Sequence, residues 1–222
     1  MLFLRLVFLT LIICISGPGW TAELVKPFWV GPFFWESKPE IAERMRTQRY
    51  IPVSMISTEE KNGDKNQIVW WMKGAGLVKA PAQFVFDYAK DLDRLAQQKD
   101  HFSEMHWLND HTELEFNFKA LGTTVKFRIK LWEAKVDDFL QLHFKFLAGP
   151  LTGAEGVILI KEVARQESQV SLILRHEGNI LSFGNTIMSI AVEGVLHHMA
   201  ESLRSAVEQS WLDNQKPLKP AN

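Results

Sequence analysis

His176 is the side chain whose type and position best suit chemistry on a bound molecule. It shares the alternation of Val170, Leu172 and Leu174, so it should project toward the apolar side at the end of a strand. An imidazole placed there can orient a carboxylate or hydroxyl of a ligand, or act as a general base. The simpler interpretation is that it caps a buried carbonyl or reaches solvent at the strand end.

A second pattern has the spacing of metal ligands. Glu193, His197 and Glu201 stand four residues apart, a spacing that brings side chains together on one helix face. The same face also carries Arg204 and Glu208, which do not belong to a metal site. We therefore interpret this set as a solvated polar face of a helix.

The remaining histidines give no site. His101, His106 and His111 recur every five residues, which matches neither a helix face nor a strand face. The sequence also lacks the Gly-x-Ser-x-Gly turn that presents a nucleophilic serine in many hydrolases. We therefore predict no catalytic residue, no metal site and no cofactor. The sequence leaves enzymatic activity open and favours a protein without it.

Apolar and polar residues alternate through residues 103–176, as in strands with one dry and one wet face. The alternation is strict in three segments and looser in two: 113–119, 125–131, 140–146, 157–163 and 170–176. An acidic strand at 113–119 beside a basic strand at 126–130 further predicts cross-strand charge pairs on the wet face.

Helical patterns flank these strands. Pro81 suits the first position of a helix, and apolar spacing predicts a pair of short helices over 81–98. A long amphipathic helix over 186–211 follows the strands, with Asn185 as its N-cap. Its apolar stripe should lie on the sheet and contains Val192, Val195, Leu196, Met199, Leu203, Ala206 and Val207.

This order of elements resembles the START-like (SRPBCC) superfamily, which includes polyketide cyclases and coenzyme Q-binding proteins. The stretch Val78-Lys79-Ala80-Pro81, followed by Val85-Phe86 and Asp91, adds to the resemblance, which covers roughly residues 67–211. It implies an α+β helix-grip fold, in which a curved antiparallel sheet of about seven strands surrounds a long C-terminal helix, with two short helices after the first core strand. It also implies a deep cavity for a hydrophobic ligand, and the family shares no universal catalytic residue.

We therefore predict an apolar ligand cavity between the sheet and the final helix. Strand alternation and the helix stripe select nine ligand-binding residues: Phe116, Phe127, Ile129, Leu142, Phe144, Leu172, Leu174, His176 and Met199. A binding or carrier protein for a lipid, quinone or polyketide-like molecule is the leading hypothesis, because the dry face is uniformly apolar. The alternatives are a cyclase- or isomerase-like enzyme that uses His176, and an interaction domain whose cavity is filled by its own side chains.

Residues 1–22 have the composition of a secretory signal. An apolar run up to Ile15 contains one early cation, Arg5, and is followed by Gly17, Pro18 and Gly19. The run is shorter than the roughly 20 apolar residues that span a bilayer. We expect export to the periplasm, with cleavage after Gly19 or near Ala22. Cleavage would remove Cys14, the one cysteine, so the exported protein must rely on its core and not on disulfides.

We divide the rest of the chain near residue 66. An N-terminal extension over 23–66, with a short helix and an edge strand, should precede a START-like domain over 67–213 and a flexible tail over 214–222. The extension holds an aromatic cluster that can contact a membrane peripherally or pack against the domain: Phe28, Trp29, Phe33, Phe34 and Trp35. With a net charge of -1 there is no basic field to attract nucleic acid.

Overall fold

The structure is a computed structural model. It describes residues 35, 37–62, 65–91, 94, 102–109, 111–120, 123–178 and 185–215. The described residues all belong to the compact unit that starts at Pro32. The predicted signal sequence and most of the predicted tail lie outside the described residues.

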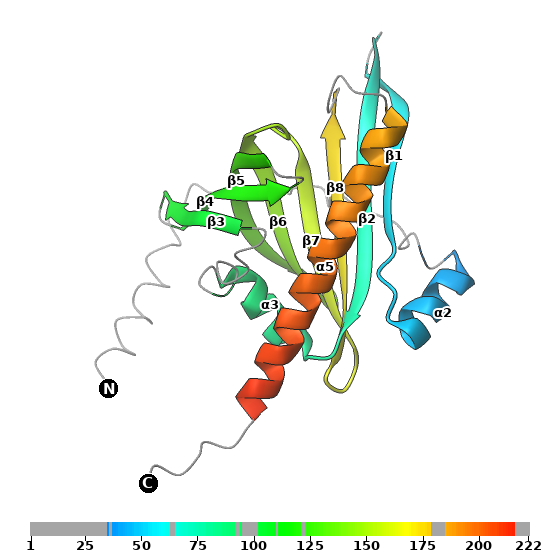
Figure 1. Cartoon of the computed structure of the whole chain (residues 1–222), viewed down its shortest axis with the longest axis vertical. Helices are drawn as coiled ribbons and strands as arrows, with labels where there is room; N and C mark the ends of the chain where they lie inside the picture. Colours follow the sequence, from blue (N-terminus) through cyan, green and yellow to red (C-terminus); the bar gives the residue numbers. More distant parts are fainter. Residues whose placement is uncertain are drawn as a thin grey trace. The chain divides into compact units, whose positions relative to one another are not determined.

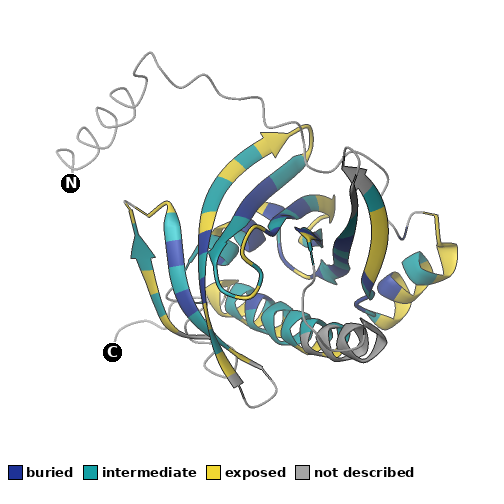
Figure 2. Cartoon of the chain, turned by 90° about the horizontal axis from the view of Figure 1, so that it is seen from above, coloured by how far each residue is buried: buried dark blue, intermediate teal, exposed yellow. Residues whose placement is uncertain are grey.

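Eight antiparallel strands form one curved sheet in the order β1-β2-β8-β7-β6-β5-β4-β3 (Figure 1). The elements run in the order α2 (Pro39–Gln48), β1 (Val53–Asn62), β2 (Lys65–Val78), α3 (Ala82–Lys90), β3 (Phe102–Leu108), β4 (Glu113–Ala120), β5 (Thr123–Val136), β6 (Phe139–Ala148), β7 (Glu155–Ala164), β8 (Glu167–Glu177) and α5 (Asn185–Gln215). Viewed from above, the strands curl around α5 (Figure 2). This is the helix-grip arrangement that the sequence predicts.

The eight strands agree with the sheet of about seven strands that the resemblance implies, together with the predicted edge strand. β1 lies at the sheet edge directly after Pro52, where a residue without an N–H is tolerated. β1 and β2 pair as one continuous hairpin, in which Glu60 lies opposite Gln67. The division expected near residue 66 therefore falls inside this hairpin, and β1 belongs to the same sheet as the core strands. Of the two short helices predicted over 81–98, α3 is the first, and nearly all of the second lies outside the described residues.

The concave face of the sheet carries most of the core. We call its larger part the inner cluster, whose buried members are Met55, Trp70, Met72, Leu114, Phe116, Phe127, Ile129, Phe144, Ala154 and Leu174. Leu196 of α5 packs against it. A second cluster lies where α3 and the C-terminal half of α5 meet the sheet, and contains Val85, Leu142, Ile160 and Val207. Alternation of apolar residues, read from the sequence, thus predicts the concave face of β4, β5 and β6 correctly.

β7 and β8 are buried on both faces. Ile160 and Leu174 belong to the concave face, while Val157, Leu159 and Ile173 point to the opposite face and are only 2–3% exposed. A strand that is covered on both sides needs apolar residues at every position, not at every second one. This explains why the alternation in these two strands is looser than in β4 and β5.

The predicted charge pairs between β4 and β5 are present. Lys126 Nζ lies 2.5 Å from Glu115 Oε1, and Arg128 Nε lies 3.9 Å from Glu113 Oε2. The hydrogen bond from Lys126 is the main cause that lowers the pKa of Glu115. The acidic and basic strands therefore attract each other on the convex face.

The prediction of a solvated polar face on α5 was wrong. This face meets residues 49–55, the chain that leads into β1, and its side chains bind backbone groups there. The contacts are Glu193 Oε1 with the N–H of Met55 (2.7 Å), His197 Nδ1 with the carbonyl of Ile51 (3.1 Å) and Arg204 with the carbonyl of Arg49 (2.6 Å). Glu208 pairs with the Arg49 side chain and accepts the N–H of Lys79 at 2.7 Å. We call these contacts the polar seam. Backbone groups at a sheet edge need partners, and α5 supplies them.

Gly156 has no room for a side chain, because the ring of its neighbour Phe144 occupies that space. A Cβ atom at residue 156 would lie 2.2 Å from Cζ of Phe144 and 2.9 Å from the carbonyl oxygen of Ile173. We expect Gly156→Ala to lower the free energy of unfolding by about 1–3 kcal/mol, as overpacking of a core does. Urea denaturation measures the change.

Gly194→Ala is the matched control, since nothing lies within 4 Å of a Cβ at that position of α5. It should raise the free energy of unfolding by up to about 1 kcal/mol, because alanine favours a helix over glycine. Adding Phe144→Leu to Gly156→Ala should recover part of the loss. Equal effects of the two glycine substitutions would contradict the packing argument.

Candidate functional site

The structure brings most of the predicted ligand-binding residues to one place. Five of the nine are buried members of the inner cluster: Phe116, Phe127, Ile129, Phe144 and Leu174. Leu172 is partly buried and packs against this cluster. Leu142 lies instead in the second cluster, with α3. Met199 is partly buried on α5, and His176 is 7% exposed.

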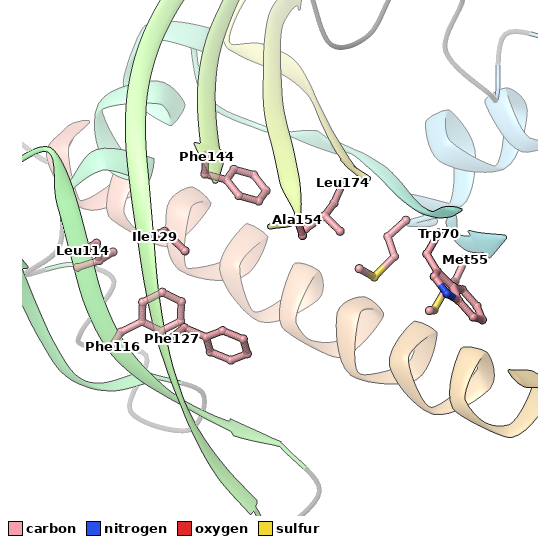
Figure 3. Packing of buried hydrophobic residues seen from close by; sticks show 10 residues of the cluster. Met55, Trp70, Leu114, Phe116, Phe127, Ile129, Phe144, Ala154 and Leu174 are labelled. Atoms are coloured by element: carbon pink, nitrogen blue, oxygen red, sulfur yellow. The ribbon is translucent and has the colours of Figure 1, made fainter. Parts of the chain in front are cut away.

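Aromatic rings from β4, β5 and β6 form one wall of the inner cluster (Figure 3). The ring of Phe127 stacks on Phe116 with centroids 5.6 Å apart and meets Phe146 edge-on at 5.4 Å. Phe146 in turn meets Phe144 edge-on at 5.9 Å. Phe146 is not among the nine predicted residues, although its alternation with Lys145 places it on the same face. These geometries are the ones that aromatic pairs prefer, so they hold the wall in shape.

The opposite wall comes from β1 and β2, and the sequence prediction did not include it. Figure 3 shows Met55 and Trp70 at the far end of the inner cluster from Phe116 and Phe127, with Leu174 and Ala154 between them. Met72 belongs to this wall as well and lies opposite Met55 in the strand register. The alternation of Ile68, Trp70 and Met72 in the residues that form β2 was the signal that could have identified it.

His176 lies beside this second wall. It is the register partner of Trp70 in the pairing of β8 with β2. Burial is the main cause that lowers the pKa of His176, and the nearby charge of Glu177 opposes it only in part. The imidazole is therefore neutral at pH 7, with one nitrogen as donor and one as acceptor.

The atom Nδ1 of His176 is buried and has no hydrogen-bond partner in the part of the chain that the structure describes. The same holds for Nε1 of Trp70. A general base normally has its second partner in place to orient it, and no described carboxylate contacts this nitrogen.

The other histidines have structural partners. His143 on the convex face hydrogen-bonds Gln141 at 2.9 Å and stacks on Trp132, and its burial lowers its pKa. His106 lies 3.1 Å from Glu115, and His111 contacts the ring of Trp107. His101 lies outside the described residues. Among the described residues, no group of His, Cys, Asp and Glu is arranged to hold a metal ion.

An open recess of about 420 Å³ lies at the β7–β8 hairpin and the end of α5. Its lining includes Lys79, Arg165, Glu167, Trp211 and Leu212. None of the nine predicted residues belongs to this lining. The recess is therefore separate from the inner cluster.

Two observations concern membranes. Within the described residues, no helix is both long enough and apolar enough to cross a bilayer. Trp35 is one of the five aromatic residues that were predicted to contact a membrane or pack against the domain. It is only 5% exposed. Its ring is thus packed inside the protein, and the other four residues lie outside the described part of the chain.

Comparison with known proteins identifies the fold. The sequence matches no protein-family model and no curated protein. The structure is similar to a START superfamily protein from Mycobacterium smegmatis (TM-score 0.53, 17% identity, covering 63% of this chain and 97% of that one). It is also similar to a protein from Thermus thermophilus (TM-score 0.53, 21% identity, 66% and 99% covered) and to the Zhui aromatase/cyclase of a Streptomyces species (TM-score 0.51, 12% identity, 67% and 96% covered).

These solved structures match almost over their full lengths, and identities this low carry information about the fold alone. The eight-stranded curved sheet and the C-terminal helix agree with that similarity. The chain therefore has the START-like (SRPBCC) helix-grip fold that its sequence predicts.

Proposed function

We propose that the protein is an exported binding or carrier protein for a hydrophobic small molecule held between the sheet and α5. The observation that carries this proposal is the inner cluster, in which apolar side chains from β1, β2, β4, β5, β6 and β8 face the helix. Ligand sites are typically apolar spaces with a few polar groups that orient the ligand. The inner cluster with Trp70 and His176 at one end has this composition.

The apolar surface of such a ligand sets the expected affinity. Burial of roughly 300 Å² at about 25 cal/mol per Å² contributes about 7 kcal/mol before the costs of association. This corresponds to micromolar binding or weaker, unless polar contacts add to it. A carrier that must also release its ligand works well in this range.

The substitution Phe127→Trp tests the proposal. Phe127 is a buried member of the inner cluster and contacts the rings of Phe116 and Phe146, so a larger ring at this position would overfill the cluster. We expect the affinity for the neutral probe N-phenyl-1-naphthylamine, measured by fluorescence titration, to fall about tenfold or more. Circular dichroism verifies that the variant is folded.

Phe139→Trp is the matched control, since Phe139 is a half-buried residue at the start of β6 that belongs to neither core cluster. It should leave the affinity for the probe unchanged. If the folded wild type binds no probe and copurifies with no lipid-like molecule, the proposal fails. An interaction domain with a filled core would then take its place.

Export is the second part of the proposal and rests on the composition of residues 1–22. Protein produced in a Gram-negative bacterium should be recovered from the periplasm with about 19 to 22 residues removed, as expected for signal cleavage. Intact-mass spectrometry of periplasmic and cytosolic fractions measures this. Recovery of the full-length chain from the cytosol would contradict export.

The aromatic cluster of the extension can add a peripheral membrane contact. Phe28, Trp29, Phe33 and Phe34 are the residue types that favour the headgroup region of a bilayer. Such a contact would suit a protein that collects or delivers an apolar molecule at a membrane.

A further inference from the structure

We infer that Trp70 and His176 together bind a neutral oxygen of the ligand, a carbonyl or a hydroxyl, at one end of the inner cluster. This inference rests on the proposed function and specifies the class of molecule. The ligand would be an apolar compound with one uncharged oxygen function, not a hydrocarbon and not a fatty acid anion.

The two side chains are placed side by side by the strand pairing. Trp70 of β2 lies directly opposite His176 of β8, so both side chains project from the same face of the sheet. That face is the concave one, because Trp70 belongs to the inner cluster. Trp70 is 6% exposed and His176 is 7% exposed, so both are more than nine-tenths buried.

Each side chain has a nitrogen that the described protein does not satisfy. Trp70 Nε1 and His176 Nδ1 are both buried, and neither has a hydrogen-bond partner among the described residues. Buried polar atoms are nearly always paired in folded proteins, and an unpaired one is costly. Two of them on adjacent strands, on the face that lines the proposed site, point to a polar group of a bound molecule.

The chemistry of the two nitrogens limits what that group can be. An indole N–H can only donate, so the ligand must offer an acceptor atom to Trp70. The neutral imidazole of His176 can donate to a carbonyl oxygen or accept from a hydroxyl, depending on its tautomer. A carbonyl or hydroxyl oxygen therefore has the lone pairs and protons that partners of both nitrogens need.

The surroundings favour an uncharged oxygen. The next pair along the two strands on this face is Met72 and Leu174, both buried and apolar. The nearest charged side chains in sequence, Arg175 and Glu177, pair with each other and not with His176. Among the described residues no cation is placed to balance a carboxylate buried here, which would be strongly unfavourable.

The test compares four probes that have the same number of carbon atoms: undecane, 2-undecanone, 2-undecanol and undecanoate. Their dissociation constants are measured by displacement of N-phenyl-1-naphthylamine from the wild type and from Trp70→Phe, His176→Phe and Met72→Leu. The measured quantity is the ratio of the undecane constant to the constant of each oxygen-bearing probe. A change in the apolar contacts alters both dissociation constants to the same extent, because the probes have the same number of carbon atoms. Such a change therefore leaves the ratio unaltered.

We expect this ratio for 2-undecanone or 2-undecanol to fall about 3- to 10-fold in Trp70→Phe and in His176→Phe, which is the usual net effect of one hydrogen bond. Met72→Leu, a change of similar volume beside the pair, should leave the ratio unchanged. An unchanged ratio in both ring variants would overturn the inference. So would an affinity for undecanoate higher than for the ketone and the alcohol.

A measurement on the wild type keeps the test decisive if a variant does not fold. The indole N–H resonance of Trp70 should shift on addition of 2-undecanone or 2-undecanol and stay in place with undecane. An equal response to undecane would contradict the inference while leaving the proposed carrier function standing. Failure of the wild type to bind any of the four probes would instead remove the proposed function, and this inference with it.

Discussion

Docking of α5 across the concave face of the sheet is the interaction on which the rest of the structure depends. Without this helix, the aromatic and aliphatic residues of the inner cluster would face water on one side. Two different kinds of contact hold it. Leu196 and Val207 pack against the sheet, and the polar seam binds the helix to residues 49–55 through backbone groups.

The two kinds of contact have different physical consequences. Apolar burial contributes most of the free energy but does not depend strongly on direction. The hydrogen bonds of Glu193 and Arg204 are directional, so they determine where along β1 the helix lies. Directional hydrogen bonds thus hold the helix on the β1 side. Apolar burial holds it against the rest of the sheet.

The sequence predicted the strands and helices because these elements are encoded in local periods, and the resemblance to the START-like superfamily implied how they assemble. Strict alternation in residues 113–119 and 125–131 predicted the faces of β4 and β5, and the 3.6-residue stripe predicted the apolar face of α5. Periodicity can tell a polar face from an apolar one. It cannot tell whether the polar face meets water or another backbone, which is why the contacts of Glu193, His197 and Arg204 were missed.

The candidate site could be predicted only in part for a related reason. Phe116, Phe127 and Phe144 come from neighbouring strands that are close in sequence, so their common face could be inferred from alternation alone. The pairing of Trp70 with His176 joins β2 to β8, with five strands of the chain between them. Strand order decides that pairing, and no local pattern in residues 67–79 indicates it.

The absent side chain of Gly156 bears on the ligand site that we propose as well as on the stability of the fold. Gly156 lies directly opposite Phe144 in the register, and the ring of Phe144 covers its backbone closely. The ring of Phe144 therefore occupies the space that a side chain at position 156 would need. Any side chain at position 156 would have to displace that ring. In the ligand site that we propose, the place of one ring would therefore be determined by a position that contributes no side-chain atoms at all.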